Sequence, residues 1–341
     1  MNKRRWVAVC VAIGLFVFSG VVSLLTPNSN ETSGIDGINA LLYGTNQLEE
    51  YVELEGDSEN RIAHIYVDGA IMNSGGGLFS GEVYNHPFFL EQLKQIQYDS
   101  SISAVLLEVN SPGGGVYESA EIAKEIRKVQ ELNIPIYVAM TNMAASGGYY
   151  ISASADKIFA TEETVTGSIG VIMSGINYSG LFEKLGIEDS TYKSGALKDM
   201  GSGSRPVTEA DSEVLQGFVD SSYGRFVNIV SEGRQIPEEQ VRQIADGRIY
   251  DGVQALENGL IDALGYPEDA LLALMEDYSL NQSQVIGYTV SSTGFANTWF
   301  GLKLAELQGL PQVNTTNRMM TLLESIGTPN APKPLYYYGG E

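Results

Sequence analysis

One serine, set between pairs of small residues, is the first feature of this sequence that could carry out covalent chemistry. Ser146 stands in TNMAASGGYY, residues 141–150, with two alanines before it and two glycines after it. Small neighbours let a substrate backbone approach the hydroxyl, although the same composition also suits a tight packing contact. A serine nucleophile needs a base to take its proton and donors to stabilise the oxyanion, so other segments must supply both.

A second glycine-rich turn, NSPGGG at residues 110–115, is a candidate source of oxyanion donors. Both turns follow short apolar segments, ISAVLLEVN and PIYVAM, that read as buried strands. Because the carboxyl ends of adjacent parallel strands meet at one edge of a sheet, we expect both turns to face one crevice. The backbone N–H groups of Gly113 and Gly147 are then the candidate oxyanion donors. Taken alone, either turn also fits a plain connection from a strand to a helix.

We do not expect a histidine to be the base that activates Ser146, because this chain contains two histidines and neither is well placed. His64 lies inside a predicted strand and His86 precedes a proline near the start of a predicted helix, so a Ser-His-Asp triad is not expected. A lysine can act as the base when burial lowers the pKa of its amine from about 10.4. The segment TYKSGALKDMGS offers Lys193 and Lys198, and residue chemistry alone also allows both to be surface lysines.

Strands and helices alternate along the part of the chain that carries these motifs. The segments RIAHIYVDGAI, DKIFA and GSIGVIM read as further strands, while HPFFLEQLKQIQYD and GYYISASA read as helices. A longer helix is predicted over residues 116–132, with Ala120, Ala123, Ile126 and Val129 along one face. After Pro206 the pattern becomes mainly helical. This alternation predicts an α/β fold with a largely parallel, buried sheet.

Composition excludes several kinds of function. The 341 residues carry 42 acidic and 20 basic side chains, a formal net charge of -22, which argues against binding to nucleic acid. Cys10 is the one cysteine, so an intrachain disulfide and a cysteine-rich zinc site are excluded. Two histidines are too few for a multi-histidine metal site. We therefore expect no metal and no organic cofactor.

The N-terminus has the pattern of a membrane anchor. Lys3, Arg4 and Arg5 precede residues 6–25, which carry no charge and as a helix would span about 30 Å, the thickness of a bilayer core. The basic residues predict a cytoplasmic N-terminus and an extracytoplasmic remainder on a single-pass protein of the cell membrane. A cleavable signal peptide is the competing interpretation, but this apolar run is longer than its usual core. Too few apolar residues precede Cys10 for a lipoprotein signal.

Four segments are therefore expected along the chain. Residues 1–26 form the basic start and the anchor, and residues 27–60 form a flexible acidic stalk. Residues 61–290 form the folded domain, and the proline-containing tail 291–341 is extended or loosely attached.

Four blocks of this sequence resemble, in order and spacing, the signal peptide peptidase A family of membrane-anchored serine proteases. They are NSPGGGVYESAEI, MAASGGYYISASADKIFATEETVTGSIGVI, KSGALKDMGS and DGRIYDGVQALENGLID, and the match runs from about Ile62 to Gly265. The chain is similar to the short, Bacillus-type form, which has one copy of the protease domain. The resemblance implies the fold of the Clp protease and crotonase superfamily, built of repeated β-β-α units.

The resemblance also implies roles for individual residues. Ser146 matches the nucleophile and Lys198, the second lysine of its block, matches the general base. Gly113 matches an oxyanion donor, and Ser168 in TGSIG matches the serine that orients the lysine amine. Implied substrates are remnant signal peptides and other unfolded peptides. Relatives of double length take serine and lysine from different copies of the domain. The resemblance therefore also implies a homo-oligomeric ring, an octamer, with active sites shared between protomers.

Two other functions compete with a peptidase. Relatives of the crotonase type act on acyl-CoA thioesters with a similar oxyanion hole and no serine nucleophile. A non-catalytic scaffold tethered to the membrane is the other alternative. The presence of both Ser146 and Lys198, and an extracytoplasmic location where CoA is scarce, favour the peptidase.

Overall fold

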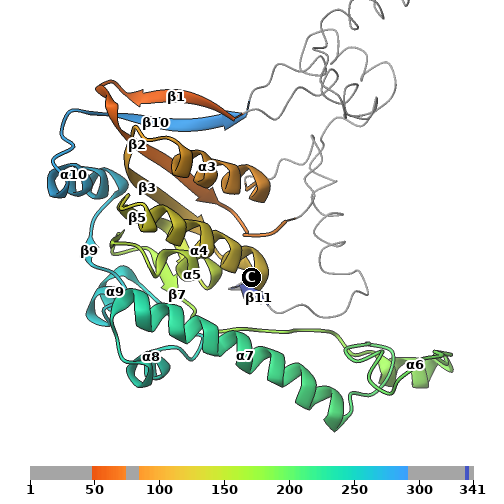
Figure 1. Ribbon diagram of the computed structural model, residues 1–341. Coiled ribbons are helices and arrows are strands. Elements are labelled where there is room, and N and C mark those ends of the chain that lie inside the picture. Colours follow the sequence, from red (N-terminus) through yellow and green to blue (C-terminus); the bar gives the residue numbers. More distant parts are fainter. Residues whose placement is uncertain (1–47, 74–83, 291–334, 338–341) are drawn as a thin grey trace, which may run out of the picture. The chain divides into compact units, whose positions relative to one another are not determined.

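A nine-stranded, mostly parallel sheet forms the centre of the protein (Figure 1). The computed structural model describes residues 48–73, 84–290 and 335–337. Along the main path the strand order is β1-β10-β2-β3-β5-β6-β9, and β7 pairs with both β5 and β8. The strands of this sheet are β1 Leu48–Leu54, β2 Asp57–Asp68, β3 Ile102–Ser111, β5 Ile136–Ala145, β6 Lys157–Ala160, β7 Val165–Gly167, β8 Ile249–Tyr250, β9 Ala263–Leu264 and β10 Ser283–Val290.

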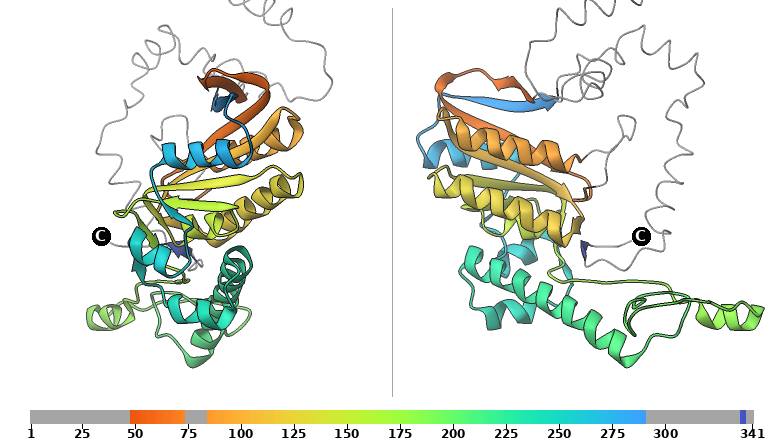
Figure 2. Two further views of the ribbon diagram at one scale, coloured as in Figure 1. Left: turned by 90° about the vertical axis from the view of Figure 1, so that its left-hand side faces the viewer. Right: turned by 45° about the vertical axis from the view of Figure 1, so that its right-hand side comes forward.

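The central strands are apolar on both faces because helices cover both faces of the sheet. α3 (His86–Tyr98) and α4 (Val116–Glu131) cover one face, where Phe89 and Ile126 join the main core. α10 (Pro267–Asp277) covers the other face through a smaller cluster that includes Leu274 (Figure 2). This arrangement confirms the predicted α/β fold with a largely parallel sheet, and it fits the Clp protease-like fold that the resemblance implies.

The apolar face of α4 differs by one residue from the prediction. Ile122, Ala123, Ile126 and Val129 are buried, but Ala120 is exposed and Ser119 is buried in its place. A Cβ on Gly147, the first residue of α5 (Gly147–Ser152), would lie 2.7 Å from the Ser119 hydroxyl oxygen, so the absence of a side chain there leaves room for the buried serine.

The segment GSIGVIM, predicted as a strand, is a strand at its first residue alone. β7 covers Val165–Gly167 and pairs in parallel with β5. The backbone then turns at Ser168, whose φ of 49° is incompatible with a strand, and farther on Ile172 forms an isolated bridge with Leu335. Periodicity could not show this break, because an apolar run continues through it.

Residues 48–60, which we expected in the stalk, form β1 and the first part of β2. β1 runs antiparallel to β10 at the edge of the sheet, and nearly all of its side chains are exposed. A strand without a buried face leaves no alternation in the sequence, which explains why it was not expected. Residues 48–60 therefore belong to the folded domain.

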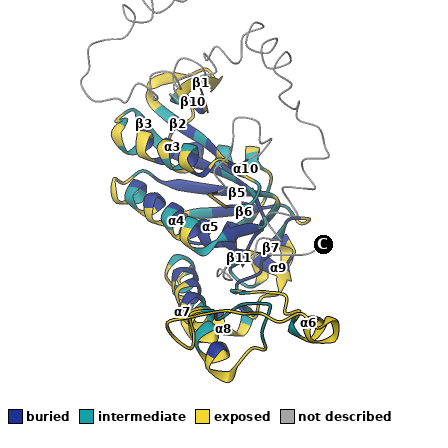
Figure 3. Cartoon of the chain, turned by 90° about the vertical axis from the view of Figure 1, so that its right-hand side faces the viewer, coloured by how far each residue is buried: buried dark blue, intermediate teal, exposed yellow. Residues whose placement is uncertain are grey.

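An arm extends from the body between β7 and α7. It contains the short helix α6 (Ser179–Leu185), which has no buried residue (Figure 3). The arm returns to α7 (Glu209–Arg234), whose second half packs in the core through Phe226 and Val230, and α8 (Glu238–Ile244) and α9 (Gly252–Glu257) follow. In Figures 1 and 2, α6 lies far from the sheet.

A segment near the C-terminus returns to the body as a strand. β11 (Leu335–Tyr337) pairs antiparallel with β4 (Gly113–Gly115), the strand formed by the glycines of NSPGGG. β11 was expected within an extended or loosely attached tail, but its central residue, Tyr336, is fully buried.

Candidate active site

Ser146 lies on a strained turn between β5 and α5. Its backbone has φ 54° and ψ -114°, a region that side chains other than glycine rarely adopt. Its N–H donates to the carbonyl of Gly167 on β7 (2.8 Å), and the carbonyl of Ser146 accepts from Tyr150 (2.8 Å) inside α5. These two hydrogen bonds hold the strained backbone in place on both sides of the turn, as expected for a serine that lies at the end of a strand.

Gly113 and Gly147 meet beside this turn, as the sequence predicts. Gly113 has φ 96°, and a Cβ on it would lie 2.5 Å from the nitrogen of Gly147. A side chain at Gly113 is therefore excluded by conformation and by space. The N–H of Gly113 donates to the side chain of Ser111 (3.1 Å), and its carbonyl accepts from Ile71 (2.8 Å). Two backbone segments thus converge next to Ser146.

Ser168 lies in the same neighbourhood. It directly follows Gly167, the residue whose carbonyl accepts the Ser146 N–H, and it is almost fully buried. Its own N–H donates to the carbonyl of Arg248 (2.7 Å), which fixes its positive φ of 49°. Ser146, Gly147, Gly113 and Ser168 are therefore gathered at one edge of the sheet.

Lys198 is placed elsewhere in the chain. It lies on the exposed loop between α6 and α7, where its N–H donates to the carbonyl of Gly195 (3.2 Å). Lys193, the other lysine of this block, forms an ion pair with Asp199 (2.8 Å). The loop belongs to the arm, far from α5, so one chain does not bring the predicted lysine to the predicted serine (Figure 1).

The described C-terminal segment forms a contact that the sequence did not predict. The ring of Tyr336 stacks on Tyr150 of α5 (4.8 Å between centroids) and contacts Phe226 of α7 (4.7 Å). Its hydroxyl donates to the carbonyl of Ser222 (2.8 Å), and burial raises its pKa. The carbonyl of Tyr336 lies 3.0 Å from the point where a Cβ on Gly147 would be. An extended peptide thus runs past Ser146 with an aromatic side chain in a pocket.

A sequence signal for this contact was present in the three consecutive tyrosines of LYYY. Aromatic side chains in a polar tail cost free energy when they stay in water, so such a cluster indicates a binding partner. Nothing local indicates that this partner is β4, because the pairing joins residues more than 200 positions apart.

The two histidines form their contacts elsewhere in the structure. His64 lies on β2 with its Nδ1 2.7 Å from Glu53 of β1, and His86 bridges the Tyr84 hydroxyl (2.6 Å) and Glu121 of α4 (3.0 Å). Neither contacts Ser146 among the interactions of the described residues. The expectation that histidine is not the base is consistent with both positions.

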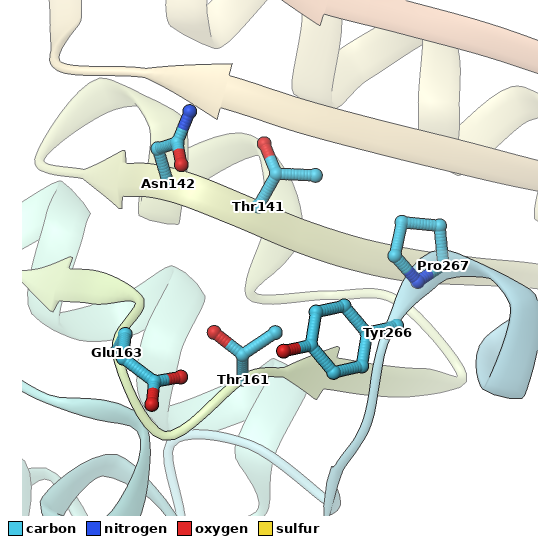
Figure 4. A pocket seen from close by; sticks show the side chains of 6 residues that line it. All are labelled: Thr141, Asn142, Thr161, Glu163, Tyr266 and Pro267. Atoms are coloured by element: carbon cyan, nitrogen blue, oxygen red, sulfur yellow. The ribbon is translucent and has the colours of Figure 1, made fainter.

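Figure 4 shows an open hollow of about 350 Å³. Thr141 and Asn142 of β5 form one wall, Thr161 and Glu163 another, and Tyr266 lies at the start of α10. None of the predicted site residues lines it.

Among residues 48–73, 84–290 and 335–337, no helix is long and apolar enough to cross a membrane. The predicted anchor, residues 6–25, lies outside that part of the chain.

Known proteins similar to this chain include several proteases. Residues 128–281 match the family model of peptidase family S49. A protein of Enterococcus faecium, provisionally named signal peptide peptidase SppA, is 55% identical over the full length of both chains. Protease 4 of Haemophilus influenzae is 30% identical over 82% of this chain and 46% of its own. The chloroplastic serine protease SPPA of Arabidopsis thaliana is 30% identical over 60% of this chain and 31% of its own.

Proposed function

The chain belongs to peptidase family S49, and from that premise we propose that it is a membrane-bound signal peptide peptidase with Ser146 as nucleophile and Lys198 as general base. Its substrates are remnant signal peptides and other unfolded peptides. The relatives' names support the serine protease activity, and the resemblance of the four sequence blocks supports the roles of the two residues.

The observation that carries this proposal is the position of β11. An extended segment of polypeptide lies antiparallel on β4, and the carbonyl of its central residue, Tyr336, lies beside Gly147, the residue after Ser146. Addition of a strand to an exposed edge is a common way to bind a peptide of varied sequence, because the backbone supplies the hydrogen bonds. The site therefore has the shape for an unfolded peptide substrate.

The chemistry proceeds in two stages. The Ser146 oxygen bonds to the carbonyl carbon of the scissile peptide while the lysine amine accepts the serine proton. The amine then gives that proton to the leaving nitrogen, and the C–N bond breaks to leave an acyl-serine, which water hydrolyses. The N–H groups of Gly113 and Gly147 stabilise the oxyanion, and Gly113 must release Ser111 to do so. Ser168 orients the lysine amine.

The lysine comes from a second copy of the chain. Lys198 is exposed on the arm and far from its own serine. Burial favours the uncharged form of a lysine amine, which is the form that can accept a proton. The arm also exposes large apolar side chains, including Ile176, Leu181, Leu185 and Tyr192. Contact with a neighbouring subunit would bury these side chains and would bring Lys198 to the serine of that subunit. A homo-oligomeric ring provides this arrangement, and the family resemblance supports an octamer.

The anchor and the stalk complete the proposal. Residues 6–25 hold the chain in the cell membrane with residues 1–5 in the cytoplasm, and residues 27–47 connect the anchor to the folded domain outside. Signal-peptide remnants lie in the same membrane, so the anchor brings the protease close to its substrate.

A direct assay tests the proposed function. The purified full chain in detergent is incubated with a synthetic signal peptide, and the cleaved bonds are mapped by mass spectrometry. We expect cleavage within the apolar core by the wild type and none by Ser146→Ala, whose fold is verified by circular dichroism. Cleavage by Ser146→Ala at the wild-type rate would show that another residue is the nucleophile.

A further inference from the structure

Four charged side chains form a cluster at the base of the arm, next to the predicted general base. The arm cluster consists of Lys193, Asp199, Arg205 and Asp211. Lys193 donates to both oxygens of Asp199 at 2.8 Å, and Arg205 donates to Asp199 at 2.9 Å. Asp199 directly follows Lys198 in the sequence, so this cluster holds the backbone that carries the lysine.

Arg205 is the centre of the arm cluster. Its two terminal nitrogens donate to the two oxygens of Asp211 at 2.5 and 2.9 Å, and one of them also donates to Asp199. Asp211 is 1% exposed and Asp199 is 16% exposed. A planar guanidinium can serve two carboxylates in this geometry, whereas a lysine amine offers a single nitrogen.

Asp211 connects Arg205 to a long helix. It is the third residue of α7, and it forms a reciprocal capping box with Thr208 at the start of this helix. The far half of α7 is fixed in the main core through Phe226 and Val230. Through Arg205, Asp199 and the adjacent backbone of Lys198 are therefore connected to a helix that is fixed in the core.

Few other contacts fix this loop. Residues 186–198 are exposed, and α6 has no buried side chain. Further connections within the arm are hydrogen bonds, from Asn177 to the Arg205 carbonyl (2.6 Å), from the Tyr178 N–H to the Gly203 carbonyl (2.9 Å) and from the Ser204 hydroxyl to Asp189. Because apolar side chains do not pack around this loop, polar contacts determine where Lys198 lies. The Arg205 side chain forms two of these contacts, one with Asp199 and one with Asp211.

We propose that Arg205 is a positioning residue that holds Lys198 in place for catalysis by tying Asp199 to the start of α7. This inference rests on the proposed function, because it takes Lys198 as the base. Hydrogen bonds from Arg205 and Lys193 lower the pKa of Asp199 to about 2, so the connection persists across the pH range in which peptide hydrolysis is measured.

Steady-state kinetics of full-length variants on a signal peptide test this role. Arg205→Gln removes the bridge, and we expect kcat to fall about 100-fold while KM stays within about twofold, because a misplaced base slows chemistry without weakening peptide binding. Arg205→Lys keeps one contact and should be intermediate. Lys193→Met should lower kcat less than Arg205→Gln, because Arg205 still holds Asp199.

A matched control and a rescue separate positioning from general damage. Arg242→Gln breaks an exposed arginine-glutamate pair within α8, 3.5 Å long, and should leave kcat unchanged. For Arg205→Ala, millimolar guanidinium chloride, far below denaturing concentrations, should restore part of kcat by filling the space between the two carboxylates. The same addition should do nothing for Lys198→Ala, which lacks the base itself.

The outcomes distinguish this inference from the proposed function. If Lys198→Ala is inactive and Arg205→Gln keeps wild-type kcat, the positioning role is wrong while the proposed base stands. If Arg205→Gln loses activity together with its oligomeric mass, and guanidinium does not restore the activity of Arg205→Ala, Arg205 is a structural residue of the assembly. If Lys198→Ala keeps wild-type kcat, the proposed base itself is wrong.

Discussion

A Cβ on Gly113 would lie 2.5 Å from the nitrogen of Gly147, although these residues belong to turns that follow different strands. It would also lie 2.1 Å from the carbonyl oxygen of Tyr336. Both atoms are backbone atoms and cannot swing aside. This close approach places two candidate oxyanion donors next to Ser146, and it depends on the absence of a side chain.

Gly113→Ala should therefore reduce hydrolysis strongly. The methyl group would force β4 away from α5, and φ 96° would be strained for alanine. Loss of one oxyanion donor typically lowers kcat by about 100- to 1000-fold, and we expect a loss in that range on a signal peptide. Gly224→Ala in α7, where a Cβ would meet nothing within 4 Å, is the control. Wild-type kcat in Gly113→Ala would show that this glycine does not shape the site.

Tyr336→Ala should increase the activity on short peptides. Its ring is buried between Tyr150 and Phe226, so β11 occupies the edge on which a substrate strand would pair. Truncation of the buried tyrosine weakens the binding of β11 to β4, so a larger fraction of the molecules has β4 free for substrate. We therefore expect KM to fall roughly tenfold with kcat unchanged.

The half-exposed Tyr337 provides the comparison for Tyr336. Tyr337→Ala leaves the buried ring in place and should keep the wild-type KM. Equal KM values for the wild type and Tyr336→Ala would mean that β11 and the substrate do not compete for β4.

The features that could be predicted from the sequence are those that a local residue pattern marks. The buried strands around Ser146 and the turns at Gly113 and Gly147 were predicted because apolar runs and glycines mark them directly. The edge strand β1 and the strand β11 were not, since each is defined by a distant partner, β10 and β4. The extra turn at Ser168 depends on a hydrogen bond to Arg248, 80 residues later, which no local pattern encodes.

The candidate site shows the same division. Ser146, Gly147 and Gly113 follow adjacent parallel strands, so the sequence pattern was sufficient to expect their two turns at one sheet edge. Ser168 was assigned by resemblance, and the pairing of β7 with β5 brings it to the same edge. Lys198 was assigned by resemblance, and the distance of its arm from the serine became evident from the structure. The roles of these residues remain predictions for the kinetic experiments.

His64 should make the stability of the fold depend on pH. Burial opposes its positive charge, but hydrogen bonds to Glu108 and Glu53 outweigh this, so its pKa is raised above the usual 6.5. The protonated ring lies 2.7 Å from Glu53 of β1 and 3.5 Å from Glu108 of β3, with Tyr66 beside it. Because the folded pKa is raised, the stabilisation is fully present below about pH 6.5 and is lost as pH rises through the folded pKa.

Urea denaturation at several pH values measures this effect. The free energy of unfolding of the wild type should exceed that of His64→Gln most at about pH 5.5 to 6.5, and the excess should shrink toward pH 9. Glu53→Gln removes one partner of the charge and should flatten the dependence. A difference between wild type and His64→Gln that grows with pH would mean that the histidine is neutral in the folded protein.

Mixing two inactive variants should restore activity if the active site is shared. In the Lys198→Ala chain Ser146 is intact, and in the Ser146→Ala chain Lys198 is intact, so a neighbouring pair can supply one complete site. With equal amounts and free exchange in a closed ring, about a quarter of the interfaces join an intact serine to an intact lysine, and about a quarter of wild-type activity is expected.

The control for subunit exchange decides how this mixture is interpreted. Each variant carries a different fluorophore, so energy transfer reports mixing, and each variant alone is carried through the same steps to give the background rate. If energy transfer shows mixed oligomers and the rate stays at background, serine and lysine act within one chain. In that case the arm must fold back onto its own α5, a rearrangement that would bury the apolar side chains of α6 without a partner.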